Sequence, residues 1–551
     1  MAFFFLNLNM KNYIYILFIF ISFKITAQNT VGTILNSTDA YDGYTLFAPL
    51  GSNETYLINN CGEIVHQWTS PFKPSASVYL LENGNLLKTG KIQNSEITFG
   101  GVGGQIELFD WDNNLLWEYT YSSTEFTQNH DVYPLPNGNI LMLAVTVMSK
   151  NDAILAGRNP SLILDENVFI PKIVELEPIL GTDEANIIWE WNMKDHLIQD
   201  FDDTKDNFGV VKDHPELLDF NYLAAELGNS NWLHINSLQY NENLDQLVIS
   251  SRLLSEIYII DHSTSKAEAA LHSGGTYEKG GDFLYRWGNP ESYGMGDTDS
   301  RTLFSQHYPH WIADDLIDAG KLLIFSNGNS RRFSSIEMIS PTTTAAGVYA
   351  YDTALGYGPT ASEWTYTDPI EPENFFSAIL SSAQRLPNGN MLICDGDSGY
   401  FFEIDSNNNI VWEYINPDTN NGLMSQGETA SANFVFRAIK FSKDYAAFTG
   451  KDLTPTKTVE INVNGNTCET LGIHPFELSN NINIYPNPTT GIISISTALS
   501  IDKIEIYNTL GKLIKVVFDN KNITLKNSYA GVYFIKIYSG NTIVTKKIIK
   551  I

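Results

Sequence analysis

The chain has 551 residues, of which 43% are hydrophobic, 18% charged and 12% aromatic. This composition excludes a disordered chain or a coiled coil, and it favours β-strands, which are rich in aromatic residues. The formal net charge is −29, so nucleic acid and anionic membranes, which are also negative, are poor partners. At most one disulfide can form, and the sequence leaves its pairing open among Cys61, Cys394 and Cys468.

Residues 1–27 have the pattern of an export signal. Lys11 precedes an apolar run over 13–23, and Ala27 is a small residue before a predicted cleavage at Gln28. A single membrane anchor is the alternative, but the run is shorter than the roughly 20 apolar residues that a span needs. We therefore expect a secreted or cell-surface protein with no stable membrane span.

A repeated unit indicates how residues 40–450 are organised. Each unit combines a turn and an apolar strand with a later strand that ends in an aromatic cluster. Asn-Gly pairs, which favour two-residue hairpins of type I′, occur in the turns Leu81-Glu-Asn-Gly-Asn85, Leu135-Pro-Asn-Gly-Asn139 and Leu386-Pro-Asn-Gly-Asn390. The six aromatic clusters lie near Trp68, Trp117, Trp189, Trp287, Trp364 and Trp412.

Repeats of this length with short strands and a terminal aromatic residue are typical of a β-propeller. We predict an all-β chain, with a six-bladed β-propeller at 40–450 followed by a small C-terminal β-sandwich. Its strands should begin near Tyr41, and the segment 434–441 can pair with the first blade to close the ring, which removes the sheet edges. Irregular insertions are expected at 143–175 and at 195–230, the second as a solvated, partly helical flap. A tandem of β-sandwiches is the alternative.

The end of the chain differs from the rest in charge and in motif. Residues 475–551 contain nine lysines and four acidic residues, in short alternating strands with Gly and Asn turns. The opening Tyr485-Pro-Asn-Pro-Thr-Thr-Gly491, the centre Tyr507-Asn-Thr-Leu-Gly511 and the basic last strand resemble the C-terminal sorting domain of type IX secretion in Bacteroidetes. The resemblance implies passage across the outer membrane, with the type IX secretion machinery as a partner. We predict this domain at 478–551 after a linker at 451–477; a generic adhesion sandwich is the alternative.

Three of the ten histidines occupy equivalent positions in different units. His130, His234 and His307 each open a unit, and equivalent positions of a propeller converge on its central axis. A single histidine at a strand start is more often structural, but three in equivalent positions favour a site. Arg252 lies on the strand after His234 and can turn its guanidinium towards the same axis. Six other histidines are expected in loops or on strand surfaces: His66, His196, His214, His262, His272 and His474.

At these residues the chain resembles the arylsulfate sulfotransferases. The resemblance covers most of 75–415 and is carried by Trp232-Leu-His-Ile-Asn-Ser237, Ser250-Ser-Arg252, Tyr285-Arg-Trp-Gly-Asn-Pro290 and Gln306-His307 before Trp311. It implies a six-bladed propeller that moves a sulfuryl group from an aryl sulfate donor to a phenol acceptor. The family works through a sulfohistidine and without a nucleotide sulfate donor, so no cofactor and no metal are expected.

The resemblance also implies a role for each residue that matches its motifs. His307 falls on the nucleophile, His234 and His130 on catalytic pocket histidines, and Arg252 and Asn236 on substrate-binding positions. No residue is a convincing counterpart of the family's late active-site threonine. The alternative is a non-catalytic propeller that binds glycans or surface ligands. The two hypotheses differ in whether the histidines and Arg252 share one pocket. The loop 100–104 lacks a following helix, so we expect it to be flexible and not a phosphate cradle.

Overall fold

The computed structural model describes residues 30–223, 230–463, 483–497, 501–508, 512–518, 521–526, 528–539 and 542–551. The predicted export signal and residues 464–477 of the predicted linker lie outside these ranges. Strands dominate the described residues, so the predicted all-β class is confirmed. No helix in the described ranges is long and apolar enough to cross a membrane.

Six antiparallel sheets make up the larger part of the structure, five with four strands in a row and the sixth with five. Counted outward from the centre, the first sheet contains β33 (Val435–Ser442), β2 (Gly43–Pro49), β3 (Glu54–Ile58) and β4 (Ile64–Thr69). The second contains β5 (Pro74–Leu80), β6 (Leu86–Lys91), β7 (Gly104–Phe109) and β8 (Leu115–Thr120). The third contains β9 (Phe126–Pro134), β10 (Ile140–Ser149), β11 (Asn167–Pro178) and β12 (Ala185–Asn192). The fourth sheet contains β15 (Ile235–Asn241), β16 (Gln246–Ser251), β17 (Glu256–Asp261) and β18 (Phe283–Trp287). The fifth contains β19 (His307–Trp311), β20 (Leu322–Ser326), β21 (Ser335–Ile339) and β26 (Trp364–Tyr366). The sixth contains β27 (Ser382–Arg385), β28 (Met391–Asp395), β29 (Tyr400–Ile404) and β30 (Ile410–Ile415).

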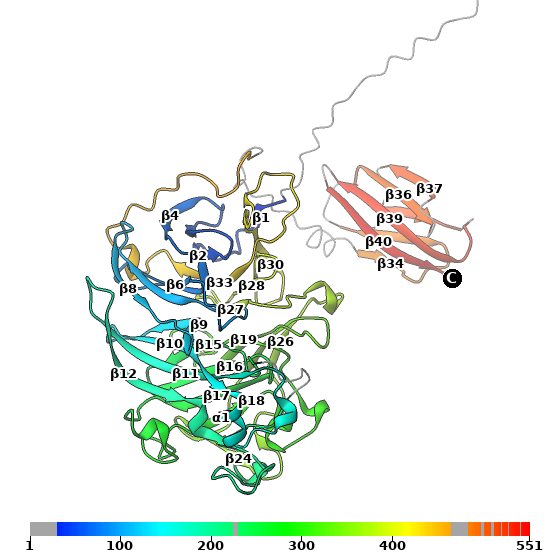
Figure 1. Ribbon diagram of the computed structural model, residues 1–551. Helices are drawn as coiled ribbons and strands as arrows, with labels where there is room; N and C mark the ends of the chain where they lie inside the picture. Colours follow the sequence, from blue (N-terminus) through cyan, green and yellow to red (C-terminus); the bar gives the residue numbers. More distant parts are fainter. Residues whose placement is uncertain are drawn as a thin grey trace, which may run out of the picture.

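The inner strands of the six sheets contact one another in a closed order. Neighbours are β33 and β5, β5 and β9, β9 and β15, β15 and β19, β19 and β27, and finally β27 and β33. In Figure 1 the sheets accordingly follow one another around a centre, with β9, β15 and β19 at their meeting point. The core lies between the faces of neighbouring sheets: Ile173 and Trp191 of the third sheet, for example, pack with Leu247 and Tyr258 of the fourth.

Two strand pairings join the end of this region to its beginning. The predicted pairing of 434–441 with the first sheet is confirmed, because β33 pairs with β2 along most of its length. A second pairing was not expected: β1 (Gly32–Asn36) adds a fifth strand to the sixth sheet beside β30. The first described strand therefore precedes Tyr41, where we expected the strands to begin.

The six predicted tryptophan positions all fall on the fourth strand of a sheet, counted outward from the centre, and most of their indoles bond to the next sheet. Trp68 donates to the carbonyl of Asp110 (3.0 Å), Trp117 to Glu184 (2.8 Å) and Trp287 to Pro359 (2.6 Å), while Trp189 donates to the hydroxyl of Thr264 (3.1 Å). Trp412 of the sixth sheet donates to Asn60 of the first (2.8 Å). A buried indole N–H needs such an acceptor, so each of these residues fastens one sheet to its neighbour.

The three Asn-Gly turns form hairpins, but not of the predicted type I′. Gly84 has a positive φ of 88° whereas Asn83 does not, and the amide of Gly84 donates to the carbonyl of Leu81 (2.9 Å). This is a three-residue loop with a glycine bulge, which needs positive φ only at the glycine. The amide of Asn85 donates to the side chain of Asn83 (3.0 Å), which explains the asparagine before the glycine.

Three expectations about the connecting segments need correction. The expected insertion at 143–175 is about half strand, because β10 and β11 extend into it and only 150–166 is irregular, with α1 (Lys150–Leu155). The segment 195–230 is not simply a solvated flap, since Ile198 and Phe220 are buried. The first residues of the predicted linker pack on the sheets: Val459 is buried, and a β-bridge joins Thr458 to Glu63.

Four two-stranded ribbons complete the connections among the described residues of this region: β13 (Leu197–Ile198) with β14 (Leu218–Asp219), β22 (Thr343–Ala345) with β23 (Val348–Tyr349), β24 (Tyr351–Asp352) with β25 (Gly356–Tyr357), and β31 (Asp418–Thr419) with β32 (Gly422–Leu423). Cys61 is disulfide-bonded, whereas Cys394 is a buried free thiol.

The C-terminal residues form two further sheets. One contains β34 (Asn483–Tyr485), β35 (Ile492–Ser496) and β38 (Asn522–Thr524); the other contains β37 (Leu513–Phe518), β36 (Lys503–Asn508), β39 (Gly531–Ser539) and β40 (Thr542–Lys550). Isoleucines of both sheets share one buried cluster, with Ile493 and Ile523 from the first and Ile504 and Ile535 from the second.

Candidate active site

The three predicted histidines lie at the inner strands of three consecutive sheets. His130 is within β9, His234 immediately precedes β15, and His307 is the first residue of β19. The backbone is irregular at each of them: His130 and His234 have positive φ values of 51° and 48°, and Tyr308, next to His307, has 50°. The pairing of each inner strand with the next strand also shifts register there. Such bulges redirect side chains out of the sheet pattern and are common beside functional sites.

Ring contacts bring these histidines together. The rings of His130 and His234 lie 4.8 Å apart, centroid to centroid. Phe436, which follows the first residue of β33, lies 6.3 Å from His130 and 6.5 Å from His307. Phe99 lies on the other flank, 6.2 Å from His130 and 6.0 Å from His234. The cluster therefore combines three imidazoles with two aromatic rings at the centre of the six sheets.

The charge of Arg252 acts on all three imidazoles. Arg252 follows β16, and its amide donates to the carbonyl of His234 (3.2 Å). Burial is the main cause that lowers the pKa of His130, to about 3, and the Arg252 guanidinium lowers it further. Burial and then nearby positive charge, including Arg252, also hold the pKa values of His234 and His307 well below 6.5. All three imidazoles are therefore neutral near pH 7 in the free protein.

Asn327 determines which nitrogen of His307 carries the proton. The side-chain amide nitrogen of Asn327 donates to the carbonyls of Ser377 (2.9 Å) and Leu380 (3.1 Å), which fixes the orientation of the amide. Its oxygen therefore faces His307 Nδ1, 2.7 Å away, and can only accept. In the neutral imidazole the proton must lie on Nδ1, so His307 Nε2 has a free lone pair.

His130 and His234 have the opposite arrangement. The side-chain nitrogen of Asn129 donates to the carbonyl of Ile235 (3.1 Å), which fixes its orientation, and it lies 3.0 Å from His130 Nδ1. The side-chain nitrogen of Asn231 lies 2.8 Å from His234 Nδ1. An amide N–H can only donate, so in both neutral imidazoles the proton is on Nε2. The cluster thus combines one lone pair with two N–H donors.

Asn236, which the sequence suggested as a substrate-binding residue, supports the neighbouring strand. It is fully buried, and its side-chain nitrogen donates to the carbonyl of Gln306 (2.8 Å). Gln306 is itself buried, and its amide donates to Ser250 Oγ (2.9 Å) and the carbonyl of Glu256 (2.9 Å). These bonds hold the residue before His307 against the fourth sheet. Asn236 is therefore placed to position His307.

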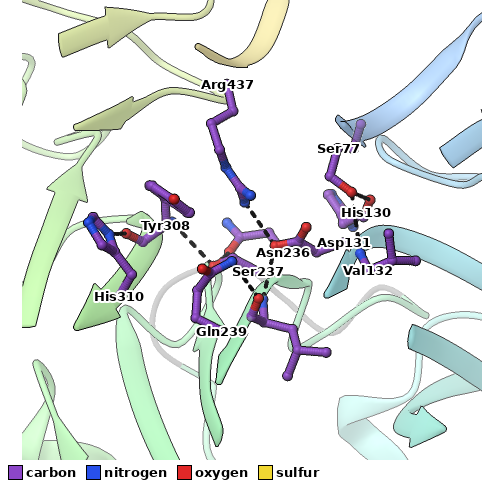
Figure 2. Close-up of polar contacts among 12 residues, drawn as sticks. Ser77, His130, Asp131, Val132, Asn236, Ser237, Gln239, Tyr308, His310 and Arg437 are labelled. Atoms are coloured by element: carbon purple, nitrogen blue, oxygen red, sulfur yellow. Dashed lines mark hydrogen bonds and ion pairs between the residues drawn. The ribbon is translucent and has the colours of Figure 1, made fainter. Parts of the chain in front are cut away.

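A buried ion pair that sequence reasoning missed braces the centre beside the histidines. Arg437 bonds to Asp131 (2.8 Å) and donates to the hydroxyl of Tyr79 (2.7 Å), and its guanidinium carbon lies 3.8 Å from the centre of the Tyr308 ring. Figure 2 shows Arg437 and Asp131 meeting between His130 and Tyr308. The pair links inner strands of four sheets. Asp131 follows His130 and Tyr308 follows His307, so this ion pair fixes the backbone on which two histidines depend.

The glycine loop at 100–104 covers His130. The amide of His130 donates to the carbonyl of Gly101 (2.6 Å), and a Cβ at Gly101 would overlap His130 Nε2. Val102 also bridges to Asn129. The loop therefore packs against β9, and its second glycine leaves room for the imidazole.

Some of the histidines that we expected in loops or on strand surfaces have other surroundings. His196 is fully buried, and His262 contacts both Asp245 (2.7 Å) and Glu175 (3.1 Å). A surface pocket of about 750 Å³ lies beside His272 and His214. It is lined by residues of 194–217 and 272–282, and none of the three predicted catalytic histidines is among them.

The solved structures that match this chain have low sequence identity to it and low TM-scores. A protein of unknown function from Bacteroides caccae matches with a TM-score of 0.38 and 11% identity, over 73% of this chain and 99% of that one. A periplasmic gluconolactonase from Pseudomonas aeruginosa matches with a TM-score of 0.37 and 8% identity, over 73% of this chain and 99% of that one. A virginiamycin B lyase from Staphylococcus aureus matches with a TM-score of 0.32 and 14% identity, over 75% of this chain and 94% of that one.

Two family models match the chain, while no curated protein does. The model for the secretion system C-terminal sorting domain matches residues 483–551, which confirms the resemblance of the C-terminal segment to that domain. The model for arylsulfotransferase (ASST) matches residues 48–437, a range that contains all three histidines and Arg252. Because this range is well over half of the 551 residues, the chain belongs to the arylsulfotransferase family.

Proposed function

We propose that this protein is an exported arylsulfate sulfotransferase that moves a sulfuryl group from an aryl sulfate to a phenol through a sulfohistidine at His307. Family membership supports the class of reaction. The observation that carries the mechanism is the pair of bonds that hold Asn327, because they leave the lone pair of His307 on Nε2.

The first half-reaction is nucleophilic attack on sulfur. His307 Nε2 forms a bond to sulfur, the bond from sulfur to the aryl oxygen breaks, and the donor leaves as a phenolate. A neutral imidazole is a good nucleophile, and the lowered pKa of His307 keeps it neutral in the free enzyme. Nδ1 keeps its proton, so the sulfated ring is cationic and still donates to Asn327.

Arg252, His130 and His234 stabilise the charge that develops in this step. A guanidinium can bond to two sulfuryl oxygens at once. The Nε2–H groups of His130 and His234 can donate to a third oxygen or to the leaving phenolate, as in an oxyanion hole. A bound sulfate ester is an anion and opposes the charge of Arg252, so its binding raises the pKa values of both imidazoles. An imidazole that takes up a proton from the solvent when the ester binds can then give that proton to the phenolate.

The second half-reaction reverses the first with another phenol. The acceptor oxygen attacks sulfur, the bond from His307 Nε2 to sulfur breaks, and the phenolic proton passes to the imidazole that protonated the donor. Phe99 and Phe436 flank the histidines and offer apolar faces to an aryl ring. Transfer in two halves predicts ping-pong kinetics.

The architecture that we propose is a six-bladed propeller with a C-terminal β-sandwich. The six sheets, the cyclic contacts of their inner strands and the bond from Trp412 to Asn60 support the ring. The isoleucine cluster shared by the last two sheets supports the sandwich. The sorting domain implies export and a secreted or surface location, through the type IX machinery, with removal of the export signal and the sorting domain.

An assay with a chromogenic aryl sulfate tests the proposal, with and without an added phenol. Release of the chromophore that requires the phenol, together with formation of the new aryl sulfate, is the expected result. Release without the phenol would mean hydrolysis and would contradict transfer. No release with any of several aryl sulfates would favour a non-catalytic binding propeller.

A further inference from the structure

Two histidines and one aspartate converge at the outer ends of the third and fourth sheets, away from the catalytic cluster. His196 ends the short 3-10 turn η2 (Met193–His196) after β12, His272 follows the turn η4 (Glu268–Ala270), and Asp282 immediately precedes β18. Their nearest nitrogen and oxygen atoms all lie within 4.8 Å of one another. His196 is fully buried and Asp282 is buried, whereas His272 is exposed.

The backbone around His196 leaves space for its ring and orients it. A Cβ at Gly281 would overlap the carbonyl of Ala269 and His196 Nε2. The ring of His196 stacks on that of Trp191 at 5.4 Å, and Trp191 Nε1 donates to the carbonyl of Gly281 (2.7 Å). These contacts fasten His196, on the third sheet, to the loop that carries Asp282, on the fourth. The position of the imidazole is therefore set by both sheets.

The hydrogen bonds leave the Nδ1 atoms of both histidines directed at one carboxylate. Among the described residues, His196 Nε2 bonds only to the carbonyl of Ala269 (2.9 Å), which can only accept, so Nε2 carries a proton. His196 Nδ1 lies 2.7 Å from Asp282 Oδ1, and His272 Nδ1 lies 2.8 Å from the same oxygen. A neutral His196 has a lone pair at Nδ1 that faces an anionic oxygen, and only a proton or a cation between them makes this contact favourable.

The pocket of about 750 Å³ opens beside this cluster. His272 and Asp282 line it, and its other charged lining residues are Lys194, Asp195, Asp206, Glu216 and Lys279. Four carboxylates and two lysines line the pocket in total, which gives it a negative balance that favours a cation. A ligand bound between His196, His272 and Asp282 would keep one side open to this space.

We propose that His196, His272 and Asp282 bind a divalent transition-metal ion, with Zn²⁺ as the best fit. Two imidazole nitrogens and one carboxylate with an open fourth position are a common zinc ligand set, and a ligand histidine usually donates its other N–H to a carbonyl, as His196 does to Ala269. Tetrahedral bonds of about 2.1 Å place ligand atoms about 3.4 Å apart. The present contacts of 2.7 and 2.8 Å therefore need to open slightly.

The metal site would join the third and fourth sheets at their outer edge and hold a water in its open position towards the pocket. This inference does not rest on the proposed sulfotransferase activity, because the two clusters share no residue. The metal is expected to raise the thermal stability of the protein, since an ion that binds only the folded chain stabilises it by mass action.

The test uses the mature secreted protein, treated with EDTA and then titrated with Zn²⁺ in competition with a chromophoric chelator. His272→Ala removes an exposed ligand, so its fold should be intact. The matched control is His214→Ala, because His214 lines the same pocket but bonds to Glu216 (3.0 Å) and lies outside the cluster. A second readout is the visible absorption of bound Co²⁺, which reports tetrahedral coordination.

We expect one Zn²⁺ per chain in the wild type and in His214→Ala, with an affinity at least about tenfold weaker in His272→Ala. The visible absorption of bound Co²⁺ should be present in the wild type and in His214→Ala and weaker in His272→Ala. The rise in melting temperature on addition of Zn²⁺ should differ among the three proteins in the same way. If the wild type binds no Zn²⁺, or if His272→Ala binds it as tightly as the wild type, the proposal is wrong. In that case the cluster is held by protons shared between the imidazoles and Asp282.

Discussion

His307 Nδ1 lies 2.7 Å from the side-chain oxygen of Asn327, whose nitrogen is held by two backbone carbonyls. This contact sets the tautomer of His307 without adding a negative charge beside it. A carboxylate at the same place would hold the same tautomer, but it would also stabilise the imidazolium and raise the pKa. The neutral amide therefore suits a histidine that must stay unprotonated as a nucleophile.

The first prediction follows from that contact and concerns Asn327→Asp. In the wild type, burial and Arg252 hold the pKa of His307 well below 6.5, so the acid limb of kcat/KM should fall below pH 6.5. The new carboxylate raises this pKa, and the neutral ring is the active form, so activity should be lost at a higher pH than in the wild type. The pH profile measures this. Asn388→Asp, at an exposed turn, is the control and should leave the pH profile unchanged. If the pH profile of Asn327→Asp is the same as that of the wild type, the assignment of His307 as the nucleophile is wrong.

The second prediction concerns the cation of the cluster. Arg252→Lys keeps the charge but loses the second hydrogen bond to the sulfuryl oxygens, which we expect to cost roughly 2 kcal/mol or more of transition-state binding. This corresponds to a fall of about thirtyfold in kcat/KM. Steady-state kinetics with saturating acceptor measure it. An unchanged kcat/KM would remove Arg252 from the site.

The third prediction compares two adjacent glycines. Gly101 has a positive φ of 87° and faces His130 Nε2, whereas nothing lies within 4 Å of a Cβ at Gly100. Gly101→Ala should displace the His130 ring and lower kcat by about 10²-fold or more, as expected for a lost acid–base group. Gly100→Ala should keep activity near that of the wild type. Equal activity of the two variants would show that the position of His130 does not matter for turnover.

The fourth prediction concerns pH and stability at His262, far from any proposed chemistry. Hydrogen bonds and charge from Asp245 and Glu175 outweigh the burial of His262 and raise its pKa from 6.5 to about 9. The raised pKa stabilises the folded state fully below pH 6.5, and this contribution is lost as the pH rises through 9. This contribution to the free energy of unfolding should be about 3 kcal/mol.

Urea unfolding of the wild type and of His262→Gln at pH 6 and at pH 9.5 measures this contribution. The variant should be less stable than the wild type at pH 6, and the difference should shrink at pH 9.5. A difference that is the same at both values would mean that His262 is not charged in the folded protein.

The sequence predicted those parts of the fold that depend on local pattern. The tryptophans marked the fourth strand of every sheet, counted outward from the centre, because an amphipathic indole at the same place in each repeat is visible without any structure. The pairing of β33 with β2 followed from the same repeat. β1 was missed because its five residues, Gly32–Asn36, carry no turn and no aromatic residue, and they form a strand only by pairing with β30.

The candidate site was predictable only in part, for a related reason. His130, His234 and His307 stand beside recognisable motifs. Asn327 and Phe436 do not: Asn327 follows β20, which pairs with β19, whereas only the closed order of the sheets brings Phe436 of β33 to His307. His196, His272 and Asp282 are separated by up to 86 residues and meet across two sheets, so that, taken one by one, the two histidines looked like loop or surface residues.

The most direct test of the central claim is to trap the sulfated enzyme. Wild-type protein is mixed with an aryl sulfate without acceptor, quenched rapidly at neutral or alkaline pH, digested, and analysed by mass spectrometry. We predict an added mass of about 80 Da, one SO₃ group, on the peptide that contains His307, labile in acid and absent from His307→Ala. His130→Ala and His234→Ala should still form the adduct, at rates about 10²–10⁴-fold lower. An adduct on another histidine, or no adduct together with sequential kinetics, would contradict covalent transfer through His307.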